Sequence, residues 1–213
     1  MQTNTLSAIT KFFGHAVSFV FHPLFVPTYF ILYLIKVVPF EFVGITDWQL
    51  QLRVFSVFWL TAFFPAFAVF LLWRLKFSDS IFLKTQKDRI IPFVIVMFFY
   101  WWMYYLSRNF SDQPIVLKYF YFGTFIASSL GLIVNNFIKV SLHGMGIGGL
   151  LTSVILVGVK YSINNIIWDM VMILLTGMVI SGRMIVSDHT NKELSLGLII
   201  GVATQILAYF WLA

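Results

Sequence analysis

Two short polar stretches interrupt an otherwise apolar chain, and each lies where one apolar segment gives way to the next. The first is Ser-Leu-His-Gly at residues 141–144, and the second runs from Arg183 through His189 to Glu193. An ionisable side chain at membrane depth costs about 2.5–3.5 kcal/mol or more, so such residues usually serve chemistry or transport. Two histidines, an arginine and a glutamate are together suited to binding and transferring a phosphoryl group.

The spacing of His189 and Glu193 predicts a histidine held in one orientation. The two residues are four positions apart, which places them on one face of a helix, where the carboxylate can accept a hydrogen bond from the ring. That bond selects which ring nitrogen keeps its lone pair, and a histidine fixed in this way can act as a nucleophile or a base. The alternative interpretation is an interfacial pair that only caps a membrane helix.

His143 starts the next apolar segment and is followed by glycines at 144, 146, 148 and 149. The amides at a helix start, together with the helix dipole, favour an anion, so this segment predicts a phosphate-binding amide at Gly144 beside His143. Glycines at this spacing are also typical of a close helix-packing face. A histidine at this position can equally be an ordinary residue of the water interface.

Fixed positive charge for a phosphate comes from two arginines and two lysines: Arg89, Arg183, Lys84 and Lys87. Arginine presents forked donors that match the geometry of phosphoryl oxygens. For each lysine, an ordinary loop charge that sets membrane orientation is an equally good interpretation.

The composition predicts an all-α integral membrane protein, because 60% of the residues are hydrophobic and only 10% are charged. We expect a single domain over residues 1–213. The absence of cysteine excludes disulfides, thiolate metal sites and cysteine catalysis. The net charge of +6 resides mostly in short loops, where it suits anionic lipid head groups better than nucleic acid.

Seven segments have the length and apolarity of membrane helices, approximately 16–37, 52–73, 90–107, 116–136, 144–160, 164–182 and 191–212. The third and the fifth are short enough to be re-entrant, so six or seven helices are expected to cross. If all seven cross, the connections around 74–89, 137–143 and 183–190 lie on one membrane face together with the N-terminus. The active site is therefore expected at helix ends on that face.

These residues resemble the type 2 phosphatidic acid phosphatases, integral membrane relatives of the vanadium haloperoxidases and glucose-6-phosphatase. The family pattern has three parts: Lys-x6-Arg-Pro, Pro-Ser-Gly-His and Ser-Arg-x5-His-x3-Asp. The third part matches best, since Arg183, His189 and Glu193 keep its spacing, with glutamate for aspartate and Gly182 for serine.

The other two parts of the pattern are altered in this chain. The second is present as Ser141-Leu142-His143, without the proline and the glycine. The first is degraded: the segment 84–92 has the basic residues and a later proline, but its lysine spacing differs from the family's. The resemblance covers roughly residues 84 to 200.

The resemblance implies a phosphohistidine mechanism that uses no metal and no cofactor. His189 would be the nucleophile, oriented by Glu193, and His143 would protonate the leaving oxygen and later help to activate water. Arg183 and Arg89 would bind the non-bridging oxygens. The resemblance further implies help in binding phosphate from Lys84 or Lys87 and from Ser141 through its hydroxyl or its amide.

We therefore expect a multi-pass protein of a bacterial cytoplasmic membrane that hydrolyses a phosphomonoester or pyrophosphate on a lipid. Phosphatidic acid, phosphatidylglycerophosphate and isoprenyl pyrophosphates present the same chemistry. One alternative is a metal-dependent membrane hydrolase with His143, His189 and Glu193 as ligands, which the two nearby arginines disfavour. Another is a non-catalytic lipid-phosphate binder or transporter, in which the degraded first motif reflects lost turnover.

Overall fold

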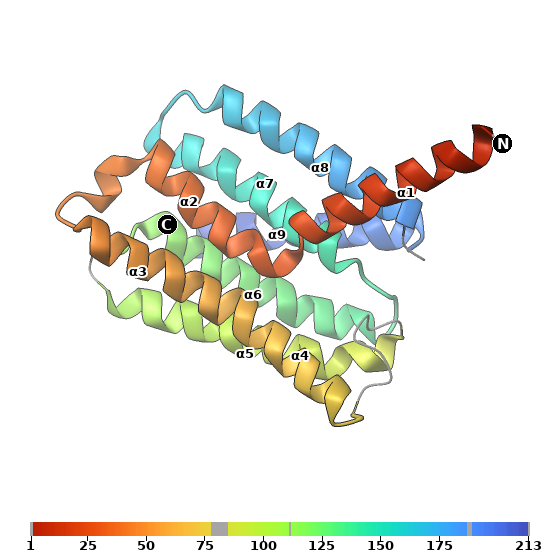
Figure 1. The fold of residues 1–213 in the computed structure, drawn as a ribbon. Coiled ribbons are helices and arrows are strands. Elements are labelled where there is room, and N and C mark those ends of the chain that lie inside the picture. The colour runs from red at the N-terminus through yellow and green to blue at the C-terminus, as the bar shows by residue number, and fades with distance from the viewer. Residues whose placement is uncertain (1, 78–84, 111, 187–188, 213) are drawn as a thin grey trace.

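The computed structural model describes residues 2–77, 85–110, 112–186 and 189–212, with side chains from residue 8 onward. Throughout these ranges the regular structure is helical, and seven segments are long and apolar enough to cross a membrane (Figure 1). The segments are Ala8–Val37, Asp47–Arg74, Gln86–Asn109, Ile115–Asn135, Leu142–Tyr161, Ile166–Val186 and Asn191–Leu212. The prediction of an all-α, multi-span membrane protein is confirmed, and the number of candidate spans is seven.

The first two spans are each built from more than one helix. In chain order the elements are α1 (Gln2–Val20), the 3-10 turn η1 (Pro23–Phe25), α2 (Val26–Val37), the 3-10 turn η2 (Pro39–Phe42), α3 (Asp47–Phe58), the π-helical turn η3 (Trp59–Phe63), α4 (Phe64–Arg74), α5 (Gln86–Asn109), α6 (Ile115–Asn135), α7 (Leu142–Tyr161), α8 (Ile166–Val186) and α9 (Asn191–Leu212).

A break between α1 and α2 interrupts the first span. Pro23 cannot donate a backbone hydrogen bond, and the chain turns there into η1, with His22 Nδ1 accepting from the Leu24 amide at 3.4 Å. Pro27 lies in the first turn of α2. The span also begins earlier than the predicted residue 16, because α1 continues the helix toward the N-terminus.

The two segments expected to be short are full-length helices. The third span gains a turn at its start because Thr85 and Asp88 form a capping box that begins α5 four residues before the predicted position 90. The fifth begins at Leu142, where the Ser141 side chain caps α7. Both helices are therefore long enough to cross.

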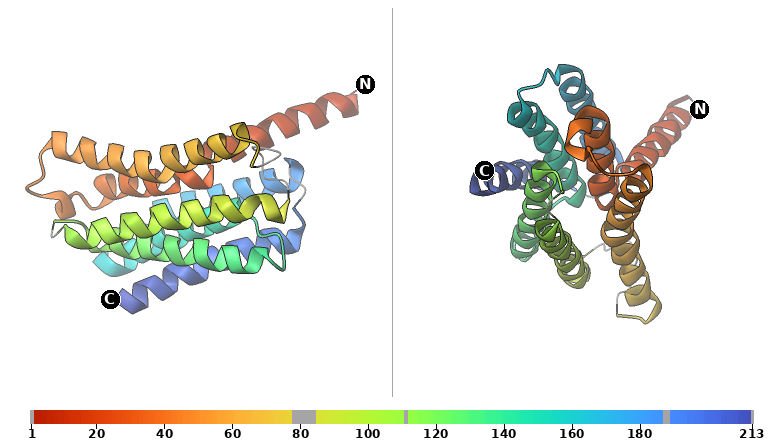
Figure 2. Two further views of the ribbon diagram at one scale, coloured as in Figure 1. Left: turned by 90° about the horizontal axis from the view of Figure 1, so that it is seen from below. Right: turned by 90° about the vertical axis from the view of Figure 1, so that its left-hand side faces the viewer.

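One end of the bundle collects the helix ends that carry the polar motifs. At the right-hand end of Figure 1, α4, α6 and α8 end and α5, α7 and α9 begin, whereas the C-terminus lies at the opposite end. Helix α1 projects beyond the bundle at this same right-hand end and packs along α8 (Figure 2). The expected gathering at one end is confirmed for the helix ends that flank these three connections and for the start of α1.

Helices α7 and α9 pack closely because glycines line their interface. A Cβ atom added at Gly148 would lie 2.6 Å from the Leu198 carbonyl oxygen, so a side chain there would force the helices apart. Small residues spaced by four allow this kind of contact between membrane helices. The close contact holds the start of α7 against the start of α9.

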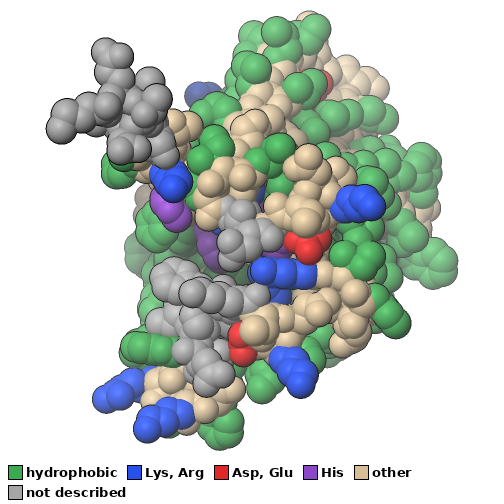
Figure 3. Space-filling view, turned by 90° about the vertical axis from the view of Figure 1, so that its right-hand side faces the viewer, with side chains coloured by type: hydrophobic (Ala, Val, Ile, Leu, Met, Phe, Trp, Pro, Cys, Tyr) green, Lys and Arg blue, Asp and Glu red, His purple; other side chains and the backbone are tan. Residues whose placement is uncertain are grey.

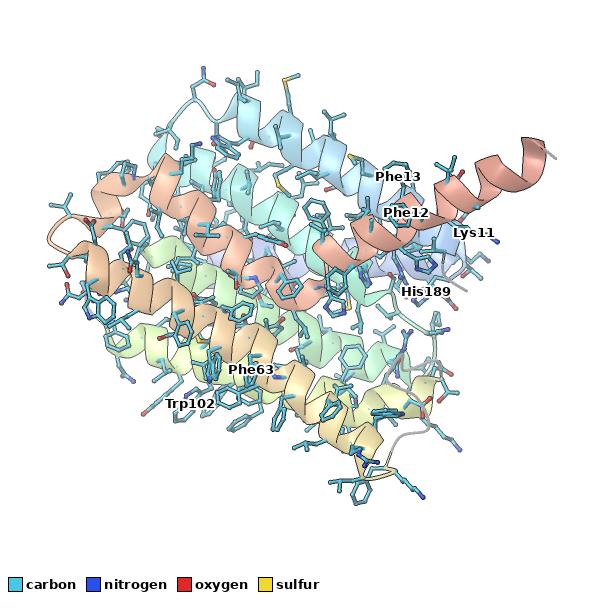
Figure 4. All side chains as sticks on the ribbon, in the orientation of Figure 1. Lys11, Phe12, Phe13, Phe63, Trp102 and His189 are labelled. Carbon is cyan, nitrogen blue, oxygen red and sulfur yellow. The ribbon has the colours of Figure 1, made fainter. Side chains whose placement is uncertain are left out.

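The outer surface of the bundle is covered by large apolar side chains. On α3 to α5 these include Phe63, Phe67, Phe98, Trp101 and Trp102, each at least 37% exposed (Figure 4). A soluble monomer rarely exposes so much contiguous apolar surface. The surface suits contact with lipid tails.

Candidate active site

Hydrogen bonds tie the starts of α5, α7 and α9 together. Arg89 Nη1 on α5 donates to the Val140 carbonyl oxygen at 2.9 Å, just before α7 begins. The Ser141 amide donates to the Glu193 carbonyl oxygen on α9 at 3.3 Å. The space-filling view of this end shows histidine, Lys or Arg, and acidic side chains near one another in the middle of the face (Figure 3).

His189 and Glu193 form the pair that their spacing predicts. His189 Nδ1 lies 2.9 Å from Glu193 Oε2, and their side chains are 4% and 17% exposed. Because a carboxylate only accepts hydrogen bonds, Nδ1 carries the proton, and Nε2 is the basic nitrogen of the neutral ring. Figure 4 places His189 at the end of the bundle where α1 projects.

Glu193 also caps α9. Its Oε2 accepts from the Thr190 amide at 3.1 Å, while its own amide donates to Thr190 Oγ1 at 3.3 Å. This is the reciprocal capping pattern of a Thr-x-x-Glu sequence. The capping interpretation and the orienting interpretation of Glu193 are therefore compatible, because one carboxylate does both.

The pKa of His189 is lowered from its usual value, chiefly by burial. The hydrogen bond from the ring to Glu193 acts in the opposite direction, and the positive charges of Arg89, Lys139 and Arg183 lower the pKa further. His189 is thus neutral at neutral pH, which is the form in which Nε2 can attack an electrophile.

His143 is held by α1. Its Nε2 lies 2.9 Å from the Ser18 carbonyl oxygen, and its ring meets the His22 ring edge-on at a centroid distance of 5.3 Å. A carbonyl can only accept, so Nε2–H donates and Nδ1 is the nitrogen that can take up or release a proton. The contact with Ser18 thus determines which nitrogen of His143 can exchange protons.

Arg183, near the end of α8, is a positive charge that lies close to several site residues. Its side chain is half-buried and lies within electrostatic range of His22, His143, His189 and Arg89. The structure therefore brings both predicted histidines and both predicted arginines into one cluster.

The predicted lysines are placed differently. Lys84 lies outside the described residues. Lys87 is exposed on α5 and lies two residues before the buried Arg89, on the other side of the helix. Among the described lysines, Lys139, which was not predicted for the site, is the one within electrostatic range of His189, and it lines a surface pocket of about 500 Å³ together with Glu193.

Ser141 and Gly144 anchor the start of α7. Ser141 is fully buried, and its Oγ accepts from the Gly144 amide at 3.2 Å. A Cβ atom at Gly144 would lie 2.8 Å from the Leu194 carbonyl oxygen. The Gly144 amide, expected to bind phosphate, is instead used for the helix cap, and the glycine serves the contact with α9.

His22 was not predicted to belong to the site. His22 contacts His143, lies within electrostatic range of Arg183 and lines an internal cavity. The sequence feature that could have identified His22 is an ionisable residue inside an apolar stretch, which is also the feature that identified the other two histidines.

The ligand set expected for a metal-dependent hydrolase is not assembled. Within the ranges that the structure describes, no three His, Cys, Asp or Glu side chains are grouped so that they could hold a metal ion. His143, His189 and Glu193 are all described residues, and His143 is directed instead to Ser18.

Comparisons with known proteins find no protein-family model, no curated protein and no solved structure that matches this chain.

Proposed function

We propose that this protein is a lipid phosphate phosphatase of a bacterial cytoplasmic membrane, acting through a phosphohistidine at His189. The observation that carries the proposal is a buried imidazole, oriented by Glu193, within electrostatic range of Arg89, Arg183 and Lys139. A neutral nucleophile surrounded by fixed cations matches the needs of a phosphoryl group in transfer. The resemblance to the type 2 phosphatidic acid phosphatases leads to the same reaction class.

In the first step, Nε2 of His189 attacks phosphorus and the bond to the leaving oxygen breaks. This step requires His143 to carry a proton on both nitrogens, and His143 gives the Nδ1 proton to that oxygen while Nε2–H stays bonded to Ser18. In the second step, Nδ1 takes a proton from water, the water oxygen attacks the phosphohistidine, and inorganic phosphate leaves. His143 then carries both protons again, and His189 is again neutral.

The cations act on the transition state. Charge spreads over the equatorial oxygens of the phosphoryl group as it moves, so preorganised guanidinium groups stabilise it more than the ground state. Arg183 and Arg89 are the candidates for this role, and Lys139 would take the role expected of Lys84 or Lys87.

Lipid substrates suit the position of the cluster. The ends of membrane-crossing helices lie at the depth of lipid head groups, so a phosphate on an apolar anchor would reach the cluster without leaving the bilayer. Phosphatidic acid, phosphatidylglycerophosphate and isoprenyl pyrophosphates are the substrates to compare.

The test is release of inorganic phosphate by the purified protein from these three lipids, with EDTA present. We expect release from at least one of them at a rate that EDTA does not change. Loss of activity in EDTA with recovery on adding a divalent cation would support the metal-dependent alternative. Binding of these lipids without release would support a binder or transporter.

The decrease of kcat/KM at acid pH reports the protonation of His189. Because the pKa of His189 is lowered, kcat/KM should fall with decreasing pH through a midpoint below 6.5, where the ring gains a proton. In Glu193→Gln the hydrogen bond to a carboxylate, which raises this pKa, is lost. The midpoint should therefore move to lower pH while the plateau rate falls. The measurement is kcat/KM against pH for both proteins.

Asp88→Asn is the control for this change, because Asp88 caps α5 at the same end of the bundle as Glu193 caps α9. It should leave the midpoint in place. If the midpoint of Glu193→Gln equalled that of the wild type, Glu193 would not be hydrogen-bonded to the histidine that reacts.

Lys139→Met should lower kcat/KM about tenfold, because it removes one partly screened positive charge near the phosphoryl group. Lys87→Met is the matched control, since Lys87 is exposed on the far side of α5, and it should stay within about twofold of the wild type. The loss for Lys139→Met should shrink as salt is added. If kcat/KM fell equally in Lys139→Met and Lys87→Met, Lys139 would contribute only to the general positive charge of the surface.

A further inference from the structure

A cavity of about 290 Å³ runs through the inside of the bundle next to the histidine and arginine cluster. Its walls come from η1, α2, α4, α5, α6, α7 and α9, and they are mostly apolar. At one end it is lined by His22 and Arg89, which belong to the cluster described above.

One face of α5 shows how far the cavity extends. The lining residues Arg89, Pro92 or Phe93, Val96 and Tyr100 recur at helical intervals of three or four. At 1.5 Å per residue, this face is about 16 Å long. The cavity thus spans about half of a hydrocarbon core that is about 30 Å thick, with Arg89 at one end.

The volume of the cavity suits one chain. Its volume is near the lower limit of about 300 Å³ for pockets that enclose small organic ligands. An apolar cavity that stays empty forfeits dispersion contacts along its whole wall, and a hydrocarbon chain would restore them. The second chain of a two-chain lipid would have to lie outside the bundle.

The wall formed by α4 is the side from which a chain could enter. Ala66 and Phe70 line the cavity and are exposed, and the neighbouring Phe67 is an exposed apolar side chain of the outer surface. A tail could therefore pass from the bilayer into the cavity without crossing water.

We infer that the cavity binds the single hydrocarbon chain of a phosphorylated amphiphile, with the phosphate at Arg89 and the tail directed toward Tyr100. The position of the phosphate rests on the function proposed above, whereas the position of the tail rests on the cavity alone. The protein should accordingly prefer a one-chain phosphate to a diacyl phosphate.

The test fills the cavity and compares chain lengths. Val96→Phe places a ring in the cavity, while Val94→Phe places the same ring on the lipid-facing side of α5, where Val94 is 43% exposed. The probes are hexadecyl phosphate, butyl phosphate and dioleoyl phosphatidic acid, each offered to the protein in phosphatidylcholine nanodiscs. Phosphate release and binding of radiolabelled probe are measured separately.

For hexadecyl phosphate, Val96→Phe should lower kcat/KM and affinity about tenfold or more, as expected when a tail is displaced from an apolar pocket. Butyl phosphate should be turned over equally by wild type and both variants, and Val94→Phe should match the wild type throughout. If nothing is hydrolysed but binding of hexadecyl phosphate still falls in Val96→Phe alone, the proposed function fails and the cavity inference stands.

Equal effects of the two variants on hexadecyl phosphate would overturn the inference, and so would tighter binding of dioleoyl phosphatidic acid than of hexadecyl phosphate. Should Val96→Phe not fold, Ala127→Phe fills the same cavity from α6. Its control is Leu130→Phe, at a residue that is 40% exposed on the same helix.

Discussion

Replacing His189 with alanine is expected to reduce phosphate release by about 10⁴-fold or more, to the background of the assay. The alanine removes the only protein atom proposed to bond to phosphorus, and the surrounding cations cannot take over that role. Substrate affinity should change much less, because Arg89, Arg183 and Lys139 remain. The measurement is single-turnover phosphate release combined with binding of the same lipid.

His15→Ala is the matched control for His189→Ala, because His15 is an exposed histidine on α1. It should keep wild-type activity and thermal stability. A His189→Ala protein that is folded and still active would contradict the phosphohistidine mechanism. Acid-labile, base-stable labelling of the wild-type protein by a phosphate-labelled lipid, absent from His189→Ala, would support it directly.

Replacing Arg183 with glutamine is expected to lower kcat by about 10³-fold, the scale found when a transition-state arginine is removed. Arg183 is the charge within range of both site histidines, so its loss affects the attack and the proton transfer together. Arg183→Lys should recover only part of the rate, since a lysine keeps the charge without the forked donors. Rates under saturating lipid separate this effect from weaker binding.

Arg74→Gln is the control for this change. Arg74 is an exposed residue at the end of α4, at the same end of the bundle. It should leave kcat unchanged. If the two glutamine variants lost activity equally, the role of Arg183 would reduce to the general positive charge of this face, and the rate should then recover in Arg183→Lys.

Local sequence was sufficient for the spans and for the histidine and carboxylate pair. A membrane helix is set by the length of an apolar run, so composition along the chain determined seven candidate spans and the parity that places their motif-bearing ends together. His189 and Glu193 lie one helical turn apart, so their contact needs only the start of α9. The ends of the helices were less predictable, because caps such as Thr85 and Ser141 extend them.

Residues that meet across helices could not be paired from the chain alone. His22 lies in the cluster because the proline break between α1 and α2 places it beside His143. Gly144 was expected to bind phosphate, but α9 packs against this glycine instead. Both outcomes depend on how neighbouring helices are placed and rotated about their axes. A pattern along one helix does not contain that rotation.

The amino-acid sequence by itself determined that this is a multi-span helical protein with a histidine–carboxylate pair at the end of one helix, because those features depend on neighbours within one or two turns. The tertiary structure decided that Lys139 rather than Lys87 lies near that pair, and that an apolar cavity begins at Arg89. Those features depend on which faces of separate helices meet. That choice is made by packing and by bonds such as the one from Arg89 to Val140.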